Sequence, residues 1–478
     1  MDADDDSGAG VLRPGAAAAG RGPGRGGEVV ILPRPVSFTR GDGEVPFDGA
    51  FQVERVAGPA EGYRLSVSAD GVRVRASDDA GEFYARQTLR QLSGPAAFRA
   101  VPPGAVALPV CEVEDHPRFA WRGVMLDVAR HFLPKHDLLR YVDLLAVHKL
   151  NVLHLHLTDD QGWRFESRRF PRLHEVGGGR PDSRFGDRRA GGMAGQPHGG
   201  YYTQDDLREV VAYAAQRQIT VVPEIDVPGH SQAAIAAYPE LGVSGGGVWT
   251  DWGVNPNVLR ADESTVDFYR QVFDELLDVF PSEVIGLGGD EAEGGDGRFV
   301  RRVAQHLHRR GRRPFGWDEV LGVGPLPTRT VVASWRGEEP GLTALDRGHD
   351  VVMCPERHLY LDYRQSDHPD EPIPVGTVTT LEDVYRYEPA AADRVLGAQA
   401  NLWTEHLDSP RRLDYAAFPR LSAFAEVVWS PAGRDEAEFL TRLAEHHLPR
   451  LDALGVEYRP LDGPRPWQAL PGVPGFPR

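Results

Sequence analysis

The sequence predicts an α/β protein, a (β/α)8 TIM barrel preceded by a small α+β domain, and three features of the chain support this fold class. Eight short apolar segments follow one another after Pro117, and amphipathic helical patterns separate most of them. The segment before Pro117 alternates apolar and polar residues in the manner of a hairpin. Polar and aromatic residues gather at the ends of the eight segments, which is where barrel enzymes place their sites.

Length and composition set the first limits. The chain has 478 residues, which is more than one ordinary core holds, so we expect a large domain and a smaller one. Its 41% hydrophobic and 26% charged residues are typical of a soluble globular protein, and no apolar run approaches the ~20 residues that a membrane-spanning helix needs. The net charge of -17 disfavours nucleic acid and anionic membrane surfaces. We therefore expect neither a nucleic-acid nor a membrane partner, and the oligomeric state stays open.

The chain ends and the cysteines are less informative. Residues 1–27 contain almost no large apolar side chains and are predicted to be a disordered, low-complexity N-terminus. The acidic start lacks the features of a secretory signal, which suggests a cytoplasmic location. Cys111 and Cys354 imply no disulfide framework, and the apolar surroundings of Cys354 predict a buried thiol.

The small α+β domain is expected at residues 28–116. The apolar run 29–33 predicts a strand, and the alternation over 64–75 predicts a hairpin with a tight turn at Asp70-Gly71. A helical pattern follows near 79–92.

The barrel is expected at residues 117–460, with a C-terminal tail at 461–478. The predicted strands are 122–128, 151–157, 219–226, 284–288, 313–317, 330–335, 350–355 and 395–401. The predicted helices include 136–149, 205–216, 264–279 and 413–428. An open doubly wound sheet is the alternative, but no Gly-x-Gly-x-x-Gly turn follows an early strand to support it.

The most informative strand end is Gly288-Gly289-Asp290-Glu291, which follows the apolar run 284–287. A buried charge needs a partner or a function, so paired carboxylates at this point indicate acid–base catalysis rather than a solvated surface turn. Adjacent strand residues point to opposite faces, so the two acids are poorly placed to act on one carbon as a nucleophile and an acid. The pattern favours one proton donor and a neighbour with another role.

Tryptophans end three further strands, at Trp317, Trp335 and Trp403. A single tryptophan would be explained by packing. Three at corresponding strand ends, together with many carboxylates, predict a carbohydrate site, because aromatic faces cover the apolar side of a sugar while carboxylates and arginine bind its hydroxyls.

With these residues assembled, the chain resembles the family 20 glycoside hydrolases, the β-N-acetylhexosaminidases. The matching segments are RGVMLDVARH at 122–131, HLHLTDDQGW at 154–163, PEIDVPGH at 223–230, GDE at 289–291, GWDE at 316–319 and ANLWTE at 400–405. Their order and spacing cover most of residues 117–430, and the small domain ahead of the barrel fits as well.

The resemblance implies an exo-acting, retaining enzyme that removes terminal N-acetylglucosamine or N-acetylgalactosamine from an oligosaccharide or glycoconjugate, without a metal or organic cofactor. The acetamido oxygen of the substrate would attack its own anomeric carbon. Glu291 would be the general acid and then the general base, a role for which we expect a raised pKa. Asp290 would hold the acetamide N–H and stabilise its positive charge.

Further roles carry over from the same motifs. Tyr360, or Tyr363 in its place, would donate to the acetamide oxygen, and Asp159 and His230 would orient Glu291. Trp317, Trp335 and Trp403 would surround the sugar, while Arg130, Asp362 and Glu405 would bind its hydroxyls. The family often has another tryptophan after the seventh strand, but the segment 379–383 has none. The leaving-group preference and the choice between gluco and galacto substrates therefore stay open.

Two rival hypotheses remain. His154 and His156 alternate on one strand and could share a metal in an amidohydrolase-type barrel, although core packing or support of neighbouring side chains explains them better. The other rival is a non-catalytic sugar-binding barrel, which the presence of Glu291 disfavours.

Overall fold

The computed structural model describes residues 29–186, 191–291, 297–372 and 377–470. The N-terminus predicted to be disordered, residues 1–27, lies outside the described residues, as does the end of the predicted tail from residue 471. The predicted domain limits, 28–116 and 117–460, remain predictions.

Eight parallel strands form a closed barrel in chain order, and the last strand pairs with the first. The strands are β6 (Trp121–Asp127), β7 (Val152–His156), β14 (Thr220–Glu224), β15 (Val284–Gly286), β16 (Arg313–Trp317), β17 (Val331–Ser334), β18 (Asp350–Met353) and β19 (Val395–Leu402). Each coincides with one predicted strand to within a few residues. The predicted fold class, a TIM barrel behind a small α+β domain, is confirmed.

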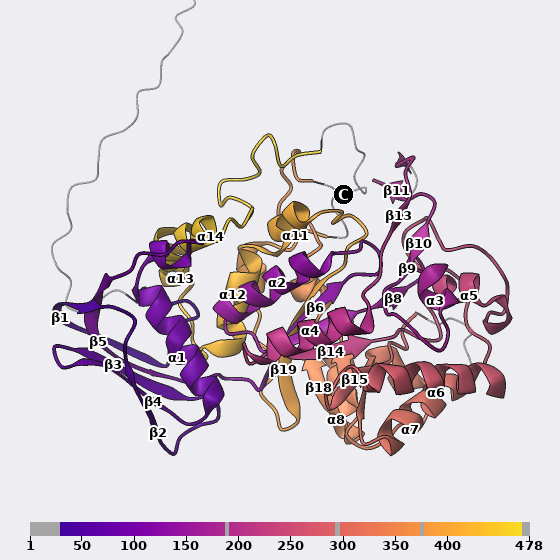
Figure 1. Cartoon of the computed structure of the whole chain (residues 1–478), viewed down its shortest axis with the longest axis horizontal. Helices are drawn as coiled ribbons and strands as arrows, with labels where there is room; N and C mark the ends of the chain where they lie inside the picture. Colours follow the sequence, from indigo (N-terminus) through magenta and orange to yellow (C-terminus); the bar gives the residue numbers. More distant parts are fainter. Residues whose placement is uncertain (1–28, 187–190, 292–296, 373–376, 471–478) are drawn as a thin grey trace, which may run out of the picture.

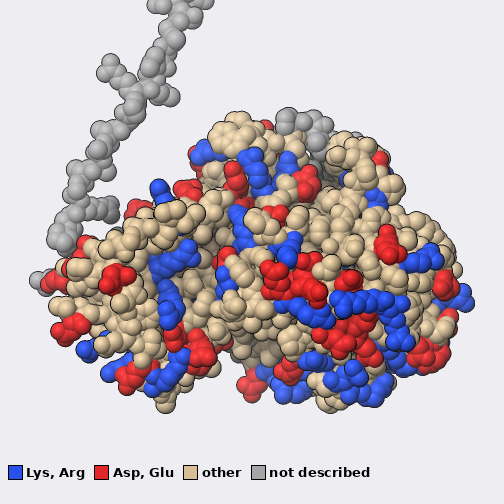
Figure 2. Space-filling model, in the orientation of Figure 1, with Lys and Arg blue, Asp and Glu red and all other residues tan. Residues whose placement is uncertain are grey.

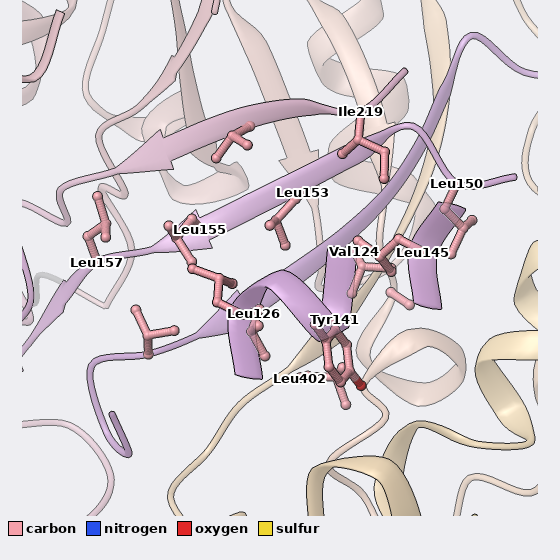
Figure 3. Close-up of a cluster of buried hydrophobic side chains, with 14 of the residues drawn as sticks. Val124, Leu126, Tyr141, Leu145, Leu150, Leu153, Leu155, Leu157, Ile219 and Leu402 are labelled. Carbon is pink, nitrogen blue, oxygen red and sulfur yellow. The ribbon is translucent and has the colours of Figure 1, made fainter. Parts of the chain in front are cut away.

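Helices surround the barrel (Figure 1). They are α2 (Lys135–Val147), α4 (Gln204–Ala215), α6 (Glu263–Leu277), α7 (Arg298–Arg309), α8 (Glu338–Asp346), α10 (Leu381–Arg386), α11 (Pro410–Ala417) and α12 (Arg420–Trp429). The 3-10 helix η3 (Asp318–Gly322) connects β16 to β17. Figure 3 shows how the layers pack: Leu145 of α2 is drawn beside Val124 of β6 and Tyr141 of α2 beside Leu402 of β19, and all four side chains are buried. Each such leucine contributes on the order of 1.5–3 kcal/mol of burial free energy.

Short elements fill the connections at the carboxyl end of the barrel. They are β8 (Thr158–Asp159), β9 (Gly162–Trp163), α3 (Arg172–Glu175), β10 (Gly179–Arg180), β11 (Arg184–Phe185), β12 (Gly192–Met193), β13 (His198–Gly199), α5 (Gln232–Ala237), η2 (Pro239–Leu241) and α9 (Glu356–Leu359). Most of them lie between β7 and α4, so the loop after the second barrel strand is the most elaborate of those described.

The small domain is a five-stranded sheet in the order β1-β5-β3-β4-β2 with one long helix. Its elements are β1 (Ser37–Phe47), β2 (Gln52–Arg55), β3 (Tyr63–Ser68), β4 (Gly71–Ala76), α1 (Asp79–Leu92), η1 (Pro95–Phe98) and β5 (Val106–Asp115). The hairpin turn lies one residue earlier than predicted. Ser68 pairs with Gly71, so Ala69-Asp70 is the two-residue loop, and Gly71 begins β4 with φ +112°.

The predicted strand at 29–33 is wrong. Ile31 and Leu32 are buried, as an apolar strand would be, but none of the strands in the described part of the chain pairs with them. Side chains satisfy their backbone instead: Leu32 N–H donates to Gln91 Oε1 at 2.8 Å, Gln91 Nε2 donates back to the Leu32 carbonyl at 2.6 Å, and Arg442 Nη1 donates to the Ile31 carbonyl. A buried segment needs every backbone group satisfied, and a glutamine does this as well as a strand.

The single helix predicted at 413–428 is two helices, α11 and α12. Pro419 lacks the N–H that a continuous helix requires, and the residue before a proline is driven out of the helical region. Phe418 is accordingly extended, with φ -105° and ψ 141°. The apolar periodicity continues across this break, which is why the pattern alone predicts one helix.

After the barrel, α13 (Glu436–Arg442), the π-helical turn η4 (Leu443–His447) and α14 (Leu448–Ala453) pack toward the small domain (Figure 1). Among the described residues, none of the helices combines the length and the apolar character needed to span a bilayer. On the face in Figure 2, acidic and basic side chains are intermixed over the barrel helices.

Two buried histidines predict acid sensitivity of the fold. His148 Nδ1 donates to the Leu144 carbonyl, so its Nε2 accepts, and His447 Nε2 lies 3.0 Å from it. Burial lowers the pKa of His148 to about 4, and burial together with the neighbouring His148 lowers the pKa of His447 well below its usual range. The unfolded chain binds these protons below ~6.5 while the folded chain does not. The unfolding free energy should therefore fall between pH 6.5 and 4, by about 1.4 kcal/mol per pH unit for each histidine.

The measurement is the slope of unfolding free energy against pH in parent and His447→Gln protein. The variant should lose part of the slope. Replacing His136, whose side chain is 89% exposed, should leave it unchanged. Equal slopes in parent and His447→Gln would contradict the assignment.

Candidate active site

The Asp290-Glu291 pair follows β15 at the carboxyl end of the barrel. Gly288 and Gly289 between strand and pair have φ +69° and +90°, a region that favours glycine. A Cβ atom on Gly288 would lie 1.7 Å from Asp226 Oδ1, so only glycine lets the chain pass over that carboxylate. The two glycines therefore turn the chain so that both acids reach the barrel mouth.

Asp290 is 8% exposed, and its Oδ1 accepts no hydrogen bond from the described residues. Burial raises the pKa of Asp290 to about 6, the negative charges of Glu224 and Glu291 add to this, and His230 opposes it. The carboxylate is thus buried with a free oxygen that a ligand N–H can reach.

His230 connects the acid pair to the rest of the site. Its Nε2 lies 3.4 Å from Glu291 Oε2 and 3.6 Å from Asp290 Oδ2, and its Nδ1 lies 3.1 Å from Asp159 Oδ1. Burial opposes a charged imidazole, but the carboxylates of Asp159, Glu291 and Asp290 raise the pKa of His230 well above its usual range. An imidazolium therefore faces Glu291.

The expected rise in the pKa of Glu291 is wrong for the free site. The neighbouring imidazole of His230 lowers the pKa of Glu291, and this outweighs the opposing effect of burial because the Glu291 side chain is still 37% exposed. The proton that sequence reasoning places on Glu291 resides on His230 beside it.

Asp159, in β8, joins the acid side of the site to the sugar-binding side. It is 1% exposed and accepts from the backbone N–H of Asp160 at 2.7 Å, from His156 Nε2 at 2.9 Å and from Arg130 Nη2 at 2.8 Å. Arg130 and His230 hold the pKa of Asp159 far below its usual range despite burial. The charged carboxylate orients both cations.

Arg130, Asp362 and Glu405 form the opposite side of the mouth. Arg130 Nε donates to Gln161 Oε1 at 3.0 Å, and its guanidinium lies 4.9 Å from the centre of the Trp403 ring. Its Nη1 lies 3.5 Å from Asp127 Oδ2 but makes no hydrogen bond within the described part of the chain. Burial raises the pKa of Asp362, and so does the nearby Glu405. Buried polar groups with atoms that lack a hydrogen bond are suited to binding hydroxyl groups.

The three predicted tryptophans converge around Tyr360. Trp317 and Trp403 have ring centres 5.7 Å apart, and Tyr360 lies 6.2 Å from both Trp335 and Trp403. Tyr360 is 8% exposed, whereas Tyr363 directs its hydroxyl to Glu356 Oε2 at 2.9 Å. This geometry favours Tyr360 over Tyr363 as the tyrosine of the site. The structure thus brings all the predicted site residues to one barrel end.

Sequence reasoning missed several supporting residues. Glu224 accepts Trp317 Nε1 at 3.0 Å, Asp226 lies behind the Gly288-Gly289 turn, and Gln161 holds Arg130. All three are buried. Each stands in a quoted motif at a strand end, so its position was visible, but nothing in a single sequence shows which neighbour it contacts.

His154 and His156, which the metal-dependent hypothesis requires as ligands, both contact carboxylates instead. His154 Nε2 lies within ion-pair distance of Glu224 Oε2, and His156 contacts Glu224 at 3.2 Å and Asp159 at 2.9 Å. Among the described residues, three sets have a geometry in which each could hold a metal ion. They are His156, Asp159 and Asp226; Asp159, Asp160 and His230; and Asp226, His230 and Asp290. In each, the histidine already neutralises a carboxylate, so the arrangement fits a charge-relay network as well as it fits a ligand set.

The leaving-group side has two described features. Glu291, Glu319 and Trp335 line a cavity of about 780 Å³ with Val254 and Asn255 of the loop after β14. The segment 379–383, which lacks the tryptophan common in the family, begins α10 with a capping box between Thr380 and Asp383. This segment is therefore the capped N-terminus of a helix.

A parallel barrel that brings an aspartate–glutamate pair, a charged histidine and a cluster of indoles to its carboxyl end defines a barrel-type glycoside hydrolase. The comparisons specify which one. The family description "Glycosyl hydrolase family 20, catalytic domain" matches residues 119–298 and 293–432, and "Glycosyl hydrolase family 20, domain 2" matches 34–116. The chain belongs to glycosyl hydrolase family 20.

Relatives of known name belong to the same class of enzyme. A beta-hexosaminidase of Porphyromonas gingivalis is 40% identical over 83% of this chain, and a beta-N-acetylhexosaminidase of Cellulomonas fimi is 36% identical over 92%. This chain spans 54% of the first relative and 87% of the second.

Solved structures give the same result. The GH20 beta-N-acetylhexosaminidase of Streptomyces coelicolor A3(2) superposes with a TM-score of 0.82 at 31% identity, covering 94% of this chain and 99% of that one. A mutant Streptomyces plicatus beta-hexosaminidase in complex with the product GlcNAc has a TM-score of 0.82 at 32% identity, covering 91% and 97%.

Proposed function

We propose that this chain is an exo-acting, retaining β-N-acetylhexosaminidase that releases terminal N-acetylglucosamine or N-acetylgalactosamine from oligosaccharides or glycoconjugates. The observation that carries this proposal is that the carboxylates of Asp290 and Glu291 both lie close to the imidazole of His230. The buried Oδ1 of Asp290 makes no hydrogen bond to the described residues and lies beside a pocket lined by tryptophan and tyrosine. Family membership supports it, because family 20 uses the acetamido group of its substrate as the nucleophile.

The first step closes a ring on the substrate. The acetamide oxygen forms a bond to the anomeric carbon while the bond to the leaving oxygen breaks, which gives an oxazolinium ion. Positive charge develops on the amide nitrogen, and the free Oδ1 of Asp290 accepts its N–H and stabilises that charge. Tyr360 donates to the acetamide oxygen and fixes its direction of attack.

Glu291 and His230 manage the proton. Glu291 protonates the leaving oxygen, and His230, 3.4 Å away, holds the proton in the free site. In the second step Glu291 takes a proton from water, the water oxygen bonds to the anomeric carbon, and the oxazolinium ring opens. Two inversions at one carbon give net retention.

The remaining residues select the sugar. Trp317, Trp335 and Trp403 surround the ring and the acetamide methyl, which buries apolar area. Arg130, Asp362 and Glu405 bind hydroxyls at the non-reducing end. Arg130 Nη1 and Asp362 Oδ1 make no hydrogen bond to the described residues, so both can form one with a sugar hydroxyl.

The test compares 4-nitrophenyl N-acetyl-β-glucosaminide with the matching β-glucoside, with the N-acetylgalactosaminide as a third substrate. Only the acetamido sugars should be cleaved, because the glucoside lacks the nucleophile. Activity should survive a strong chelator. Comparable cleavage of the glucoside would refute substrate assistance, and loss of activity with the chelator would favour the metal-dependent rival.

A further inference from the structure

We infer that Glu319 is a positioning residue that holds the Trp335 indole in place and thereby limits the size of the N-acyl group that the site accepts. Glu319 lies in η3, after β16, and no step of the mechanism above uses it. Its Oε2 accepts the indole N–H of Trp335 at 3.0 Å. This inference rests on the proposed function, in which Trp335 borders the acetamide methyl.

The indole needs such a partner because packing alone does not fix it. Trp317 is 1% exposed, whereas Trp335 is only partly buried. One face of Trp335 lies against Tyr360, with ring centres 6.2 Å apart and planes at 22°. A stacked ring can still slide and rotate in its plane, and a directional hydrogen bond to the ring edge removes that freedom.

The backbone beneath the ring is fixed separately. Asp318, the neighbour of Glu319, accepts the backbone N–H of Trp335 at 3.0 Å and that of Arg336 at 3.2 Å. The two adjacent acids of η3 thus divide the task, because Asp318 fixes the main chain of Trp335 and Glu319 fixes its side chain.

Glu319 also forms an ion pair with Arg336, but a long one made by its other carboxylate oxygen. The Arg336 guanidinium donates to Asp318, and its Nε lies 3.7 Å from Glu319 Oε1, which is beyond hydrogen-bond distance. The Glu319 carboxyl is instead 20% exposed and lines the cavity shared with Glu291. Burial, with Asp290 nearby, raises the pKa of Glu319 to about 7, as expected for a carboxyl that faces the site rather than solvent.

Consequences for specificity follow from the size of a methylene group. One additional methylene in an apolar pocket changes kcat/KM by roughly 10- to 200-fold when the surrounding side chains are rigid. If the Trp335 ring is released, the pocket can widen. The kcat/KM for an N-propionyl substrate should then rise relative to that for the N-acetyl substrate, because the larger acyl group fits and the smaller one loses van der Waals contact with the Trp335 ring.

The experiment measures the kcat/KM ratio of N-acetyl to N-propionyl 4-nitrophenyl β-glucosaminides. Glu319→Leu removes the acceptor and should lower the ratio by roughly tenfold. Glu319→Gln keeps a carbonyl acceptor and should retain the parental ratio. Trp335→Phe removes the N–H, so adding Glu319→Leu to it should change nothing further.

A parental ratio in Glu319→Leu, additive effects in the double variant, or equal ratios in the Leu and Gln variants would each overturn the inference. A crystal structure of Glu319→Leu gives a readout that needs no turnover. A rotated or displaced Trp335 ring supports the positioning role even where the proposed activity fails, and an unmoved ring refutes it. Failure of the proposed function shows separately, as a parent protein that cleaves no acetamido sugar.

Discussion

Replacing Asp290 by asparagine is expected to lower kcat on N-acetyl-β-glucosaminides by two to three orders of magnitude. The substitution keeps the shape of the side chain but removes the charge that faces the acetamide nitrogen, and loss of one such stabilising group typically costs roughly 10²–10³ in rate. Since Asp290 is a buried acid with a raised pKa, the neutral amide should not weaken the fold. The measurement is kcat by steady-state kinetics alongside a thermal unfolding curve.

Glu291→Gln is the matched comparison, because it removes the proton donor and leaves the charge on Asp290. Its defect should shrink on a 2,4-dinitrophenyl glycoside, whose leaving group needs no protonation. The defect of Asp290→Asn should be similar on good and poor leaving groups, because ring closure needs its charge in both cases. Identical leaving-group dependence in the two variants would contradict these separate roles.

The dependence of kcat/KM on pH gives a further test of the role of Asp290. The pKa of Asp290 is raised to about 6, so its carboxylate is lost as pH falls through that value. The kcat/KM of the parent should therefore decline on the acid side near pH 6. In Asp290→Asn this limb should disappear, and its persistence would assign it to another group.

The sequence predicts the fold and the chemistry of the site for an identifiable reason. Strand positions follow from apolar runs such as 284–287. In a parallel barrel, the residues that follow the strands all lie at the same end of the barrel. Asp290, His230 and Trp403 lie far apart in the chain, yet the topology alone brings them together. Family motifs add the roles, which still await the kinetic tests.

What the sequence does not show is how side chains pair across the fold. The pKa of Glu291 is lowered because His230 lies beside it, which depends on a left-handed backbone at both residues, with φ +50° at His230 and +45° at Glu291. Likewise the run 29–33 has a strand-like composition, but Gln91 satisfies its backbone from a helix. Lys149 appears in the sequence only as one of two lysines.

That lysine is the basis of the largest predicted effect on stability. Lys149 follows α2 of the barrel, and Asp115 ends β5 of the small domain; both are fully buried, with Nζ 2.7 Å from Oδ2. Tyr63 and Trp429 also donate to Asp115, at 2.7 Å and 3.0 Å, and Nζ lies 4.5 Å from the Trp429 ring. One ion pair thus joins the sheet of the small domain to two helices of the barrel.

Lys149→Met should lower the unfolding free energy by about 3–5 kcal/mol, because it leaves the Asp115 carboxylate buried without its cation. Asp115→Asn should also be destabilising, because it leaves the Lys149 ammonium buried without its carboxylate. The double variant removes both charges and should be more stable than either single variant, since an uncharged pair avoids the desolvation cost. Urea unfolding measures all three. A loss below about 1 kcal/mol in Lys149→Met, or a double variant less stable than both singles, would show that the pair does not connect the two parts of the molecule energetically.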